Sequence, residues 1–161
     1  MQRITPCLWF DHQAEEAAVF YTDIFKNSKI LDTARYTESG HELHGMPSGS
    51  VMTVSFELDG QCFTALNGGP VFTFSEAISL QVDCETQQEV DYYWEKLSEG
   101  GDPNARQCGW LKDKFGVSWQ IVPNLLPKLL ADATKAKPVM DAVFKMQKID
   151  IAELQRIAAE R

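Results

Sequence analysis

Residues 4–25, with the sequence ITPCLWFDHQAEEAAVFYTDIF, decide how this chain folds. Residues 4–10 are apolar enough to predict a strand, and Asp11 is placed to cap a helix that follows. From Ala14 onward, small and apolar residues recur at helical spacing, which predicts a helix with one buried face. These residues are Ala14, Ala17, Ala18, Tyr21, Ile24 and Phe25. The segment therefore predicts a strand that leads directly into a helix.

Further strands and turns follow this strand and helix. Residues 29–36 predict a strand, whereas residues 37–50 hold three glycines, a proline and two histidines and predict a loop. Residues 50–58 alternate in polarity, Asp59-Gly60 is a strong hairpin signal, and residues 61–66 form the returning strand.

The same order of elements recurs in the second half of the chain. The predicted elements are a strand over residues 77–82, a cap at Asp83, a helix over residues 87–97, and a hairpin formed by residues 107–111 and 117–122. An offset of 72 residues places Phe10-Asp11 on Val82-Asp83 and Phe20-Tyr21 on Tyr92-Tyr93. An internal duplication is the economical explanation of this match.

The duplication predicts an α+β fold built from two paired βαβββ modules. Their curved mixed sheet would enclose a cavity, with helices on its outer face. Module 1 covers about residues 4–69 and module 2 about residues 72–123, within a single domain of residues 1–161. Residues 124–161 predict short helices over residues 125–133, 138–148 and 151–159, the last capped by Asp150. The apolar residues of these helices, which serve either the domain itself or a protein partner, are Val139, Ala142, Val143 and Met146.

The charge balance restricts the partners of the protein. Its 161 residues carry a formal net charge of −8, and basic residues are scattered, which argues against nucleic acid and anionic membranes as partners. There is no apolar run of transmembrane length and no leader-like start, so we expect a cytoplasmic protein. None of the four cysteines forms a C-x-x-C pair, which favours buried reduced thiols over a nucleophilic Cys108.

Several strings carry a resemblance to a known family. They are FYTDIF (residues 20–25), ALNGG (65–69), FTFSEAISLQV (72–82), CGWLKDKFGVSWQIVP (108–123) and MDAVFKMQKIDIAEL (140–154). With the duplicated layout, they resemble the vicinal-oxygen-chelate superfamily, which includes glyoxalase I, extradiol dioxygenases and bleomycin-resistance proteins. Within it, the chain is similar to the PhnB-like subgroup, often labelled 3-demethylubiquinone-9 3-methyltransferase-like. The resemblance implies a homodimer in which modules of two chains complete the cavities.

The resemblance also implies where a metal would bind in metal-using relatives. The four ligand positions fall here on Pro6, Asn67, Ala77 and Gln120. Proline and alanine offer no side-chain donor, and two neutral amides do not hold a divalent transition metal against water. We therefore expect no metal and no other cofactor. The alternative is a metal-dependent lyase, isomerase or dioxygenase-like enzyme that uses Glu76, His44 and Gln120.

The polar Gln120 in the apolar strand of residues 117–122 is a metal ligand, a substrate contact or a residue satisfied by backbone or water. In the second interpretation it shares a cavity face with residues of other strands, and His44 reaches the same cavity from its loop. The expected lining is Leu8, Phe10, Phe63, Ala65, Asn67, Ser79, Gln81, Trp110, Ser118, Gln120 and His44. This mostly apolar lining suits a small organic ligand. We expect Trp9 and Trp119 to face the helices.

Binding or sequestration of a small organic molecule is the function that the sequence favours. A Rossmann-type methyltransferase needs a glycine-rich turn after its first strand, but Asp11-His12-Gln13 stands there, so methyl transfer is unsupported. His41 and His44 lie three residues apart in a glycine-rich loop without a third ligand nearby, which favours exposed histidines over a zinc pair. His44 as a general base is an alternative.

Overall fold

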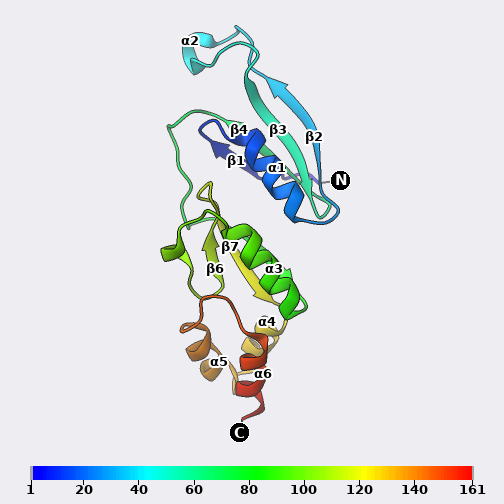
Figure 1. Ribbon diagram of the computed structural model, residues 1–161, viewed down its shortest axis with the longest axis vertical. Helices are drawn as coiled ribbons and strands as arrows, with labels where there is room; N and C mark the ends of the chain where they lie inside the picture. Colours follow the sequence, from blue (N-terminus) through cyan, green and yellow to red (C-terminus); the bar gives the residue numbers. More distant parts are fainter. Residues whose placement is uncertain (1, 161) are drawn as a thin grey trace. The chain divides into compact units, whose positions relative to one another are not determined.

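The computed structural model describes residues 2–160, and the chain separates into two compact units (Figure 1). Within the described residues, unit 1 ends at Phe74 and unit 2 begins at Ser75. Each unit combines one mixed sheet with helices, so the predicted α+β class is confirmed. In residues 2–160, no helix combines the length and apolar character needed to cross a membrane.

Unit 1 contains a four-stranded sheet with the order β1-β4-β3-β2. Its elements are β1 (Cys7–Phe10), α1 (Ala14–Ile24), β2 (Lys29–Arg35), α2 (His41–His44), β3 (Val51–Leu58) and β4 (Gln61–Asn67). Strand β1 is parallel to β4, and the other pairs are antiparallel. Asp59 and Gly60 both have positive φ angles, 47° and 83°, as a two-residue hairpin turn requires. The short helix α2 lies in the region predicted as a loop.

Helix α1 covers one face of this sheet. Its small residues Ala14, Ala17 and Ala18 are completely buried, which lets the helix approach the strands closely. Tyr21 stacks on Phe56 with 6.1 Å between ring centroids, and Phe56 stacks on Phe63 at 5.5 Å. The buried strand residues of unit 1 are Leu8, Phe10, Val54, Phe56, Leu58, Phe63 and Ala65. Every second strand residue therefore contributes to one apolar layer.

Unit 2 contains a three-stranded sheet with the order β5-β7-β6. Its elements are β5 (Ser79–Cys84), α3 (Gln87–Ser98), a 3-10 turn (Pro103–Ala105), β6 (Trp110–Lys112), β7 (Ser118–Pro123), α4 (Leu125–Leu130), α5 (Ala136–Val143) and α6 (Ile151–Ala159). Strand β5 is parallel to β7, as β1 is to β4. The 3-10 turn follows α3 at the place in the chain where an edge strand follows α1. Among the described residues, this second module therefore has one strand fewer than the predicted βαβββ unit.

The turn between β6 and β7 is organised by the buried carboxylate of Asp113. Its Oδ1 accepts hydrogen bonds from the backbone N–H groups of Phe115 (2.9 Å) and Val117 (3.0 Å). Its Oδ2 accepts one from the indole Nε1 of Trp119 at 2.9 Å. The charged turn of the sequence thus supplies an internal acceptor that fixes Trp119 beneath the sheet.

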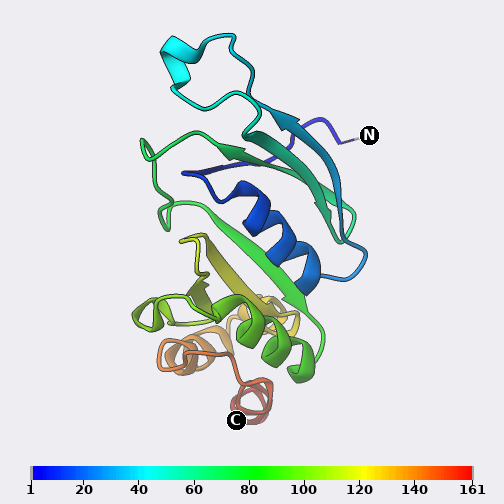
Figure 2. The same cartoon turned by 45° about the horizontal axis from the view of Figure 1, so that its top comes forward.

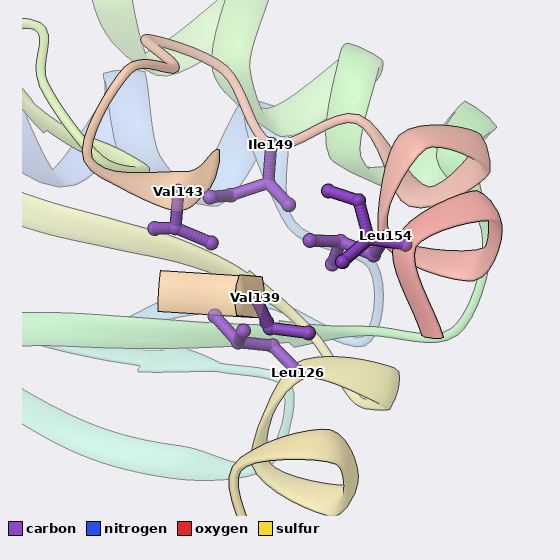
Figure 3. Close-up of a cluster of buried hydrophobic side chains, with 6 residues drawn as sticks. Leu126, Val139, Val143, Ile149 and Leu154 are labelled. Atoms are coloured by element: carbon purple, nitrogen blue, oxygen red, sulfur yellow. The ribbon is translucent and has the colours of Figure 1, made fainter. Parts of the chain in front are cut away.

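The C-terminal helices are an integral part of unit 2. Helices α4, α5 and α6 contact one another and enclose a cluster of buried apolar side chains (Figures 2 and 3). The cluster consists of Leu126, Val139, Val143, Ile149, Leu154 and Ile157. Cys108 and Val122 from the sheet region pack against it. Of the two roles left open for Val139 and Val143, the structure supports packing within the domain itself.

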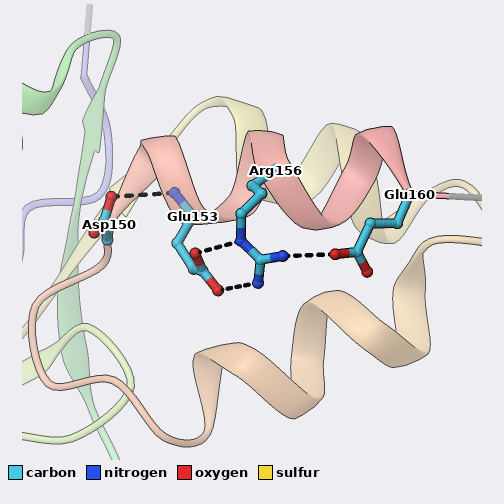
Figure 4. Close-up of polar contacts among 4 residues, drawn as sticks. All are labelled: Asp150, Glu153, Arg156 and Glu160. Carbon is cyan, nitrogen blue, oxygen red and sulfur yellow. Dashed lines mark hydrogen bonds and ion pairs between the residues drawn. The ribbon is translucent and has the colours of Figure 1, made fainter.

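Helix α6 begins and ends with polar contacts (Figure 4). Asp150 caps it by accepting a hydrogen bond from the Glu153 N–H at 3.2 Å, which confirms the predicted cap. Arg156 forms a bidentate pair with Glu153 and also donates to Glu160 at 2.6 Å. The two carboxylates raise the pKa of the Arg156 guanidinium above its usual value.

The other two predicted caps are wrong. Asp11 does not cap α1; the Ala14 N–H instead donates to the side chain of Asn67, 53 residues away in sequence, at 2.8 Å. Asp83 lies inside β5, and the side chain of Thr86 caps α3 by accepting from the Glu89 N–H at 3.2 Å. In unit 1 a tertiary contact has replaced the local capping that the sequence indicated.

Candidate functional site

The face of the unit 2 sheet opposite α3 carries the candidate site. Trp119 and Ile121 of β7 are buried on the α3 side, so the residues that alternate with them, Ser118 and Gln120, point to the other face. The strand register adds neighbours on that face: Ser79 pairs with Ser118, Gln81 with Gln120, and Trp110 with Gln120. Ser79, Gln81, Trp110, Ser118 and Gln120 therefore share one face of the unit 2 sheet.

A pocket of about 360 Å³ lies on this face. It is lined by Glu76, Ala105, Gln107, Cys108, Trp110, Leu111, Lys112, Ser118 and Phe144. Of the predicted site residues, the structure brings Trp110 and Ser118 together here. Gln120 lies beside the pocket and donates a hydrogen bond to the Ser79 hydroxyl at 2.9 Å. Gln81 donates to Asp83 at 2.8 Å on the exposed part of the face.

Ser118 is the polar group of the pocket that lacks a partner. Its residue is 1% exposed, and its Oγ has no hydrogen-bond partner among residues 2–160. A buried hydroxyl without a partner costs about 1–3 kcal/mol, because its hydration is lost and nothing replaces it. Buried polar groups in folded proteins are almost always satisfied, so this hydroxyl is the polar group of the pocket with a free hydrogen-bonding capacity.

Lys112 places a positive charge in the same pocket. It lies two residues after Trp110 on β6, hence on the same face, and it pairs with Ser118 in the strand register. Its ammonium group forms an ion pair with Glu76, a carboxylate whose side chain is 63% exposed. The hydrogen bond from Lys112 holds the pKa of the Glu76 carboxyl below its usual value. An exposed ion pair is worth little, so a ligand anion can compete with Glu76 for Lys112.

Four predicted lining residues of unit 1 point toward helix α1 and not toward the open face of their sheet. Leu8, Phe10, Phe63 and Ala65 are all less than 9% exposed and belong to the layer beneath α1. They form the core of unit 1, so their assignment to a ligand cavity is wrong. The physical reason is that α1 needs an apolar surface to pack against, and these positions supply the most continuous one.

Asn67 is also a structural residue. Its Oδ1 accepts from the Ala14 N–H at 2.8 Å, and its Nδ2 donates to the Val51 carbonyl at 3.1 Å. Its own backbone carbonyl accepts from the Tyr36 hydroxyl at 2.5 Å. Because both ends of the amide are used inside unit 1, Asn67 is not available to a ligand or to a metal.

The opposite face of the unit 1 sheet carries a second hollow of about 630 Å³. It is lined by Trp9, Asp11, His12, Tyr36, Leu43, His44, Gly45, Met46, Leu66, Gly68, Gly69, Pro70 and Val71. Trp9 therefore lines a pocket, against the prediction that it faces the helix. His44 lines this hollow of unit 1, whereas the prediction from the sequence placed it in the cavity of Gln120. Its ring lies 4.6 Å from that of Tyr36.

The polar groups of this second hollow already have partners. Trp9 Nε1 donates to the Gly69 carbonyl at 2.9 Å. His44 Nδ1 accepts from the Met46 N–H at 2.9 Å, and its Nε2 lies 3.1 Å from the Ser39 carbonyl. Both ring nitrogens of His44 are therefore engaged within its own loop, and neither is available to act as a general base.

The donors at the four family metal positions do not form a metal site. Proline and alanine supply no donor, Asn67 is used as described, and Gln120 is bonded to Ser79. The alternative donors have partners too: Glu76 pairs with Lys112, and His44 is fixed within its loop. Within residues 2–160, no group of three or more His, Cys, Asp or Glu side chains is arranged to hold a metal ion.

Sequence reasoning missed Lys112 and Phe144 as pocket residues. The alternation that identified Ser118 and Trp110 also places Lys112 on their face, so the signal was present in the strand pattern. Phe144 lies more than twenty residues beyond the last strand, and its position depends on how the C-terminal helices fold back onto unit 2. No local pattern reports that contact.

Comparisons with known proteins agree with this fold. A family model described as 3-demethylubiquinone-9 3-methyltransferase matches residues 2–122. A PhnB protein from Bacillus cereus that carries the same methyltransferase name is 39% identical, with a TM-score of 0.63; the match covers 76% of this chain and 99% of that one. No curated protein matches the chain.

Two more distant solved structures share the fold. Protein PA1353 from Pseudomonas aeruginosa is 18% identical, with a TM-score of 0.57 and coverage of 76% of this chain and 98% of that one. The fosfomycin resistance protein FosX from Listeria monocytogenes, solved with Mn(II) and sulfate, is 13% identical, with a TM-score of 0.51. That match covers 81% of this chain and 95% of FosX. At these identities the likeness concerns the fold alone.

Proposed function

Because this chain belongs to the 3-demethylubiquinone-9 3-methyltransferase family, a PhnB-like group of the vicinal-oxygen-chelate superfamily, we propose that it binds a small organic carboxylate. The binding site is the unit 2 pocket lined by Trp110, Lys112 and Ser118. The observation that carries the proposal is the buried Ser118 hydroxyl, which has no partner among the described residues.

The chemistry of the pocket favours an anion with an apolar body. The Ser118 hydroxyl donates a hydrogen bond to one carboxylate oxygen of the ligand. The ligand carboxylate also takes the place of Glu76 as the counter-ion of the Lys112 ammonium. Trp110 and neighbouring apolar groups contact the rest of the molecule. A mostly apolar pocket with two convergent polar groups is typical of small-molecule sites.

The family name describes a methyl transfer, which we do not propose for this chain. Strand β1 is followed by Asp11-His12-Gln13, without the glycine-rich turn of a dinucleotide-type site. The N-terminal N–H of α1, the group that would face a bound phosphate or carboxylate in such a site, already donates to Asn67. These residues do not form a dinucleotide-type site, so methyl transfer is left out of the proposed function.

The proposal is tested with a panel of monocarboxylates, namely acetate, hexanoate, benzoate and 2-naphthoate. Thermal shift and calorimetry on the whole protein should show binding that weakens with added salt, since Lys112 is partly exposed. In Ser118→Ala, loss of a hydrogen bond to a charged group should weaken binding about tenfold.

Ser98→Ala is the matched control, because Ser98 is also buried but its hydroxyl already bonds to the Glu95 carbonyl at 3.4 Å. It should leave carboxylate binding unchanged. Absence of carboxylate binding to the wild-type protein, or equal binding by Ser118→Ala, would overturn the proposal.

We further propose that the protein works without a resident metal. The support is the donor chemistry at Pro6, Ala77 and Gln120 together with the internal use of Asn67. Calorimetry with Zn²⁺, Mn²⁺, Ni²⁺ and Fe²⁺ should give no stoichiometric binding in the micromolar range. Tight binding of one ion per chain would instead favour the metal-dependent lyase, isomerase or dioxygenase alternative.

A homodimer and a cytoplasmic location complete the proposal. Leu43, Val71 and Phe72 of unit 1 are 89%, 71% and 61% exposed, and the Phe72 ring lies 4.9 Å from that of Trp9. This exposed apolar surface supports a second copy of the chain that covers it. Light scattering should give twice the chain mass, and Leu43→Ser combined with Val71→Ser should reduce the measured mass toward that of the monomer.

The cysteines support the cytoplasmic location. All four are free thiols, which fits a reducing compartment.

A further inference from the structure

The pocket of unit 2 has one wall that comes from outside the region matched by the family. The family model ends at residue 122, whereas Phe144 follows α5 in the C-terminal segment. Phe144 lines the same pocket as Trp110 and Ser118, yet the residue remains 59% exposed. A large apolar ring in this position gains contact area when a ligand covers it.

The backbone around Phe144 is held against the loop that precedes Trp110. Gln107 Nε2 donates to the Phe144 carbonyl at 2.9 Å. The N–H groups of Cys108 and Gly109 donate to the carbonyls of Met146 and Gln147 at 2.8 Å and 2.7 Å. Residues 144–147 are therefore tied by three hydrogen bonds to the loop that leads into β6.

The other side of the C-terminal segment is anchored to α3. Gln87 donates to the Ile149 carbonyl at 3.1 Å and accepts from the Ile151 N–H at 2.8 Å. Val143, immediately before Phe144, is buried in the apolar cluster of the C-terminal helices (Figure 3). The backbone at Phe144 is thus fixed on both sides, while its ring is left free of the core. Such a residue is placed to contact a ligand rather than to stabilise the fold.

We propose that Phe144 is a specificity-determining residue, which makes the pocket selective for aromatic carboxylates over short aliphatic ones. This inference rests on the proposed carboxylate site. Trp110 and Phe144 supply two aromatic surfaces to the body of the ligand, and Lys112 with Ser118 holds its carboxylate. Removal of the Phe144 ring should then weaken the contacts with the aromatic body of a ligand and leave the contacts with its carboxylate intact.

The test compares 2-naphthoate with hexanoate as probes, measured by calorimetry on the full chain. Phe144→Ala should weaken 2-naphthoate binding about tenfold and change hexanoate binding less than twofold, since ring contacts are worth about that factor. Phe144→Tyr should restore 2-naphthoate binding. Tyr92→Ala removes another exposed aromatic side chain of unit 2, on α3, and should leave both affinities unchanged.

Equal losses for the two probes, or no loss for either, would overturn the role of Phe144. If the wild-type protein binds 2-naphthoate in a Ser118-dependent manner but Phe144→Ala binds it equally well, the carboxylate site stands and only this inference fails. If the wild-type protein binds no carboxylate, both fail. Because Phe144 is exposed, its replacement should leave the unfolding midpoint in urea unchanged, which separates lost contacts from misfolding.

Discussion

The open sheet faces of the two units use their polar groups differently. In unit 1, the indole of Trp9, the hydroxyl of Tyr36 and both ring nitrogens of His44 bond to groups of the same unit. In unit 2, the hydroxyl of Ser118 is buried and has no partner within residues 2–160. A polar group that is satisfied internally supports the architecture, whereas one that is left unsatisfied is available to a ligand. The comparison therefore favours unit 2 over unit 1 for the ligand binding that we propose.

The two units also differ in how a buried polar side chain secures the fold. In unit 1, the neutral amide of Asn67 joins the start of α1 to β4. In unit 2, helix α3 is capped locally by Thr86, and the buried carboxylate of Asp113 fixes the β6–β7 hairpin instead. The consequences of losing each anchor should differ in size, and the difference can be measured.

The largest effect is expected for Asp113→Ala. It leaves the N–H groups of Phe115, Val117 and the Trp119 indole without their acceptor, so unfolding in urea should become easier by about 4 kcal/mol. Asp113→Asn keeps one acceptor oxygen and should cost about half as much. In unit 1, Asp59→Ala alters an exposed hairpin turn and should cost only about 1 kcal/mol, through its positive φ angle. Equal costs at the two hairpins would contradict the comparison.

A smaller loss is expected when the anchor of unit 1 is removed. Asn67→Ala removes the acceptor of the buried Ala14 N–H and a donor to the Val51 carbonyl, at a cost of about 3 kcal/mol in free energy of unfolding. Thr86→Ala removes the corresponding local cap of unit 2 and should cost about 1 kcal/mol. Chemical denaturation of both variants measures this, and a cost for Thr86→Ala above that for Asn67→Ala would be inconsistent with a tertiary cap.

The next effect concerns the close approach of Trp9 to Gly68 in unit 1. A β-carbon at Gly68 would overlap the indole ring of Trp9, so Gly68→Ala should displace the ring and cost about 2 kcal/mol. The double variant Trp9→Ala with Gly68→Ala removes the overlap, and within it the Gly68 change should cost almost nothing. Thermal and urea unfolding of the four proteins in this cycle measure the coupling. Additive costs would show that Gly68 serves another purpose.

Much of the fold followed from local patterns in the sequence. The Asp59-Gly60 turn, the Asp150 cap and the one buried face of α1 all depend on residues close in sequence. The cap of α1 did not, because Asn67 reaches it from a strand 53 residues away. Local sequence shows that a helix terminus needs an acceptor, but it does not show which distant strand supplies one.

The candidate site was predictable in unit 2 and was assigned to the wrong face in unit 1. Strand β7 alternates clearly, but β1 is only four residues long, and Leu8, Trp9 and Phe10 are all apolar, so alternation does not distinguish its faces. The offset of 72 residues places Trp9 on Gln81, a residue of the open face. This internal match therefore indicates that Trp9, and not Leu8 or Phe10, lies on the open face of unit 1. Phe144 required the tertiary packing of the C-terminal helices, which no repeat or periodicity encodes.

The smallest predicted effect is a pH dependence that belongs to unit 2 and its C-terminal segment. Asp91 on α3 accepts from Lys148 at 2.8 Å and from Gln87 at 2.9 Å, and these bonds hold the pKa of its carboxyl below the usual value. Because the pKa is lower in the folded state, the ionised carboxylate stabilises the fold at pH values above its unfolded pKa of about 4. This stability is lost as the pH falls through the folded pKa.

The pair is about half exposed, so its contribution should be only about 0.5 kcal/mol. Asp91→Asn should therefore be slightly less stable than the wild type at pH 7, and the difference should shrink as the pH falls below the unfolded pKa of the carboxyl. Hydrogen exchange of the Ile151 N–H, which bonds to Gln87, reports the C-terminal segment, while the Ala14 N–H reports unit 1 and should not respond. A difference that grew on acidification, or that appeared equally at Ala14, would show that the ion pair does not act locally on the C-terminal segment.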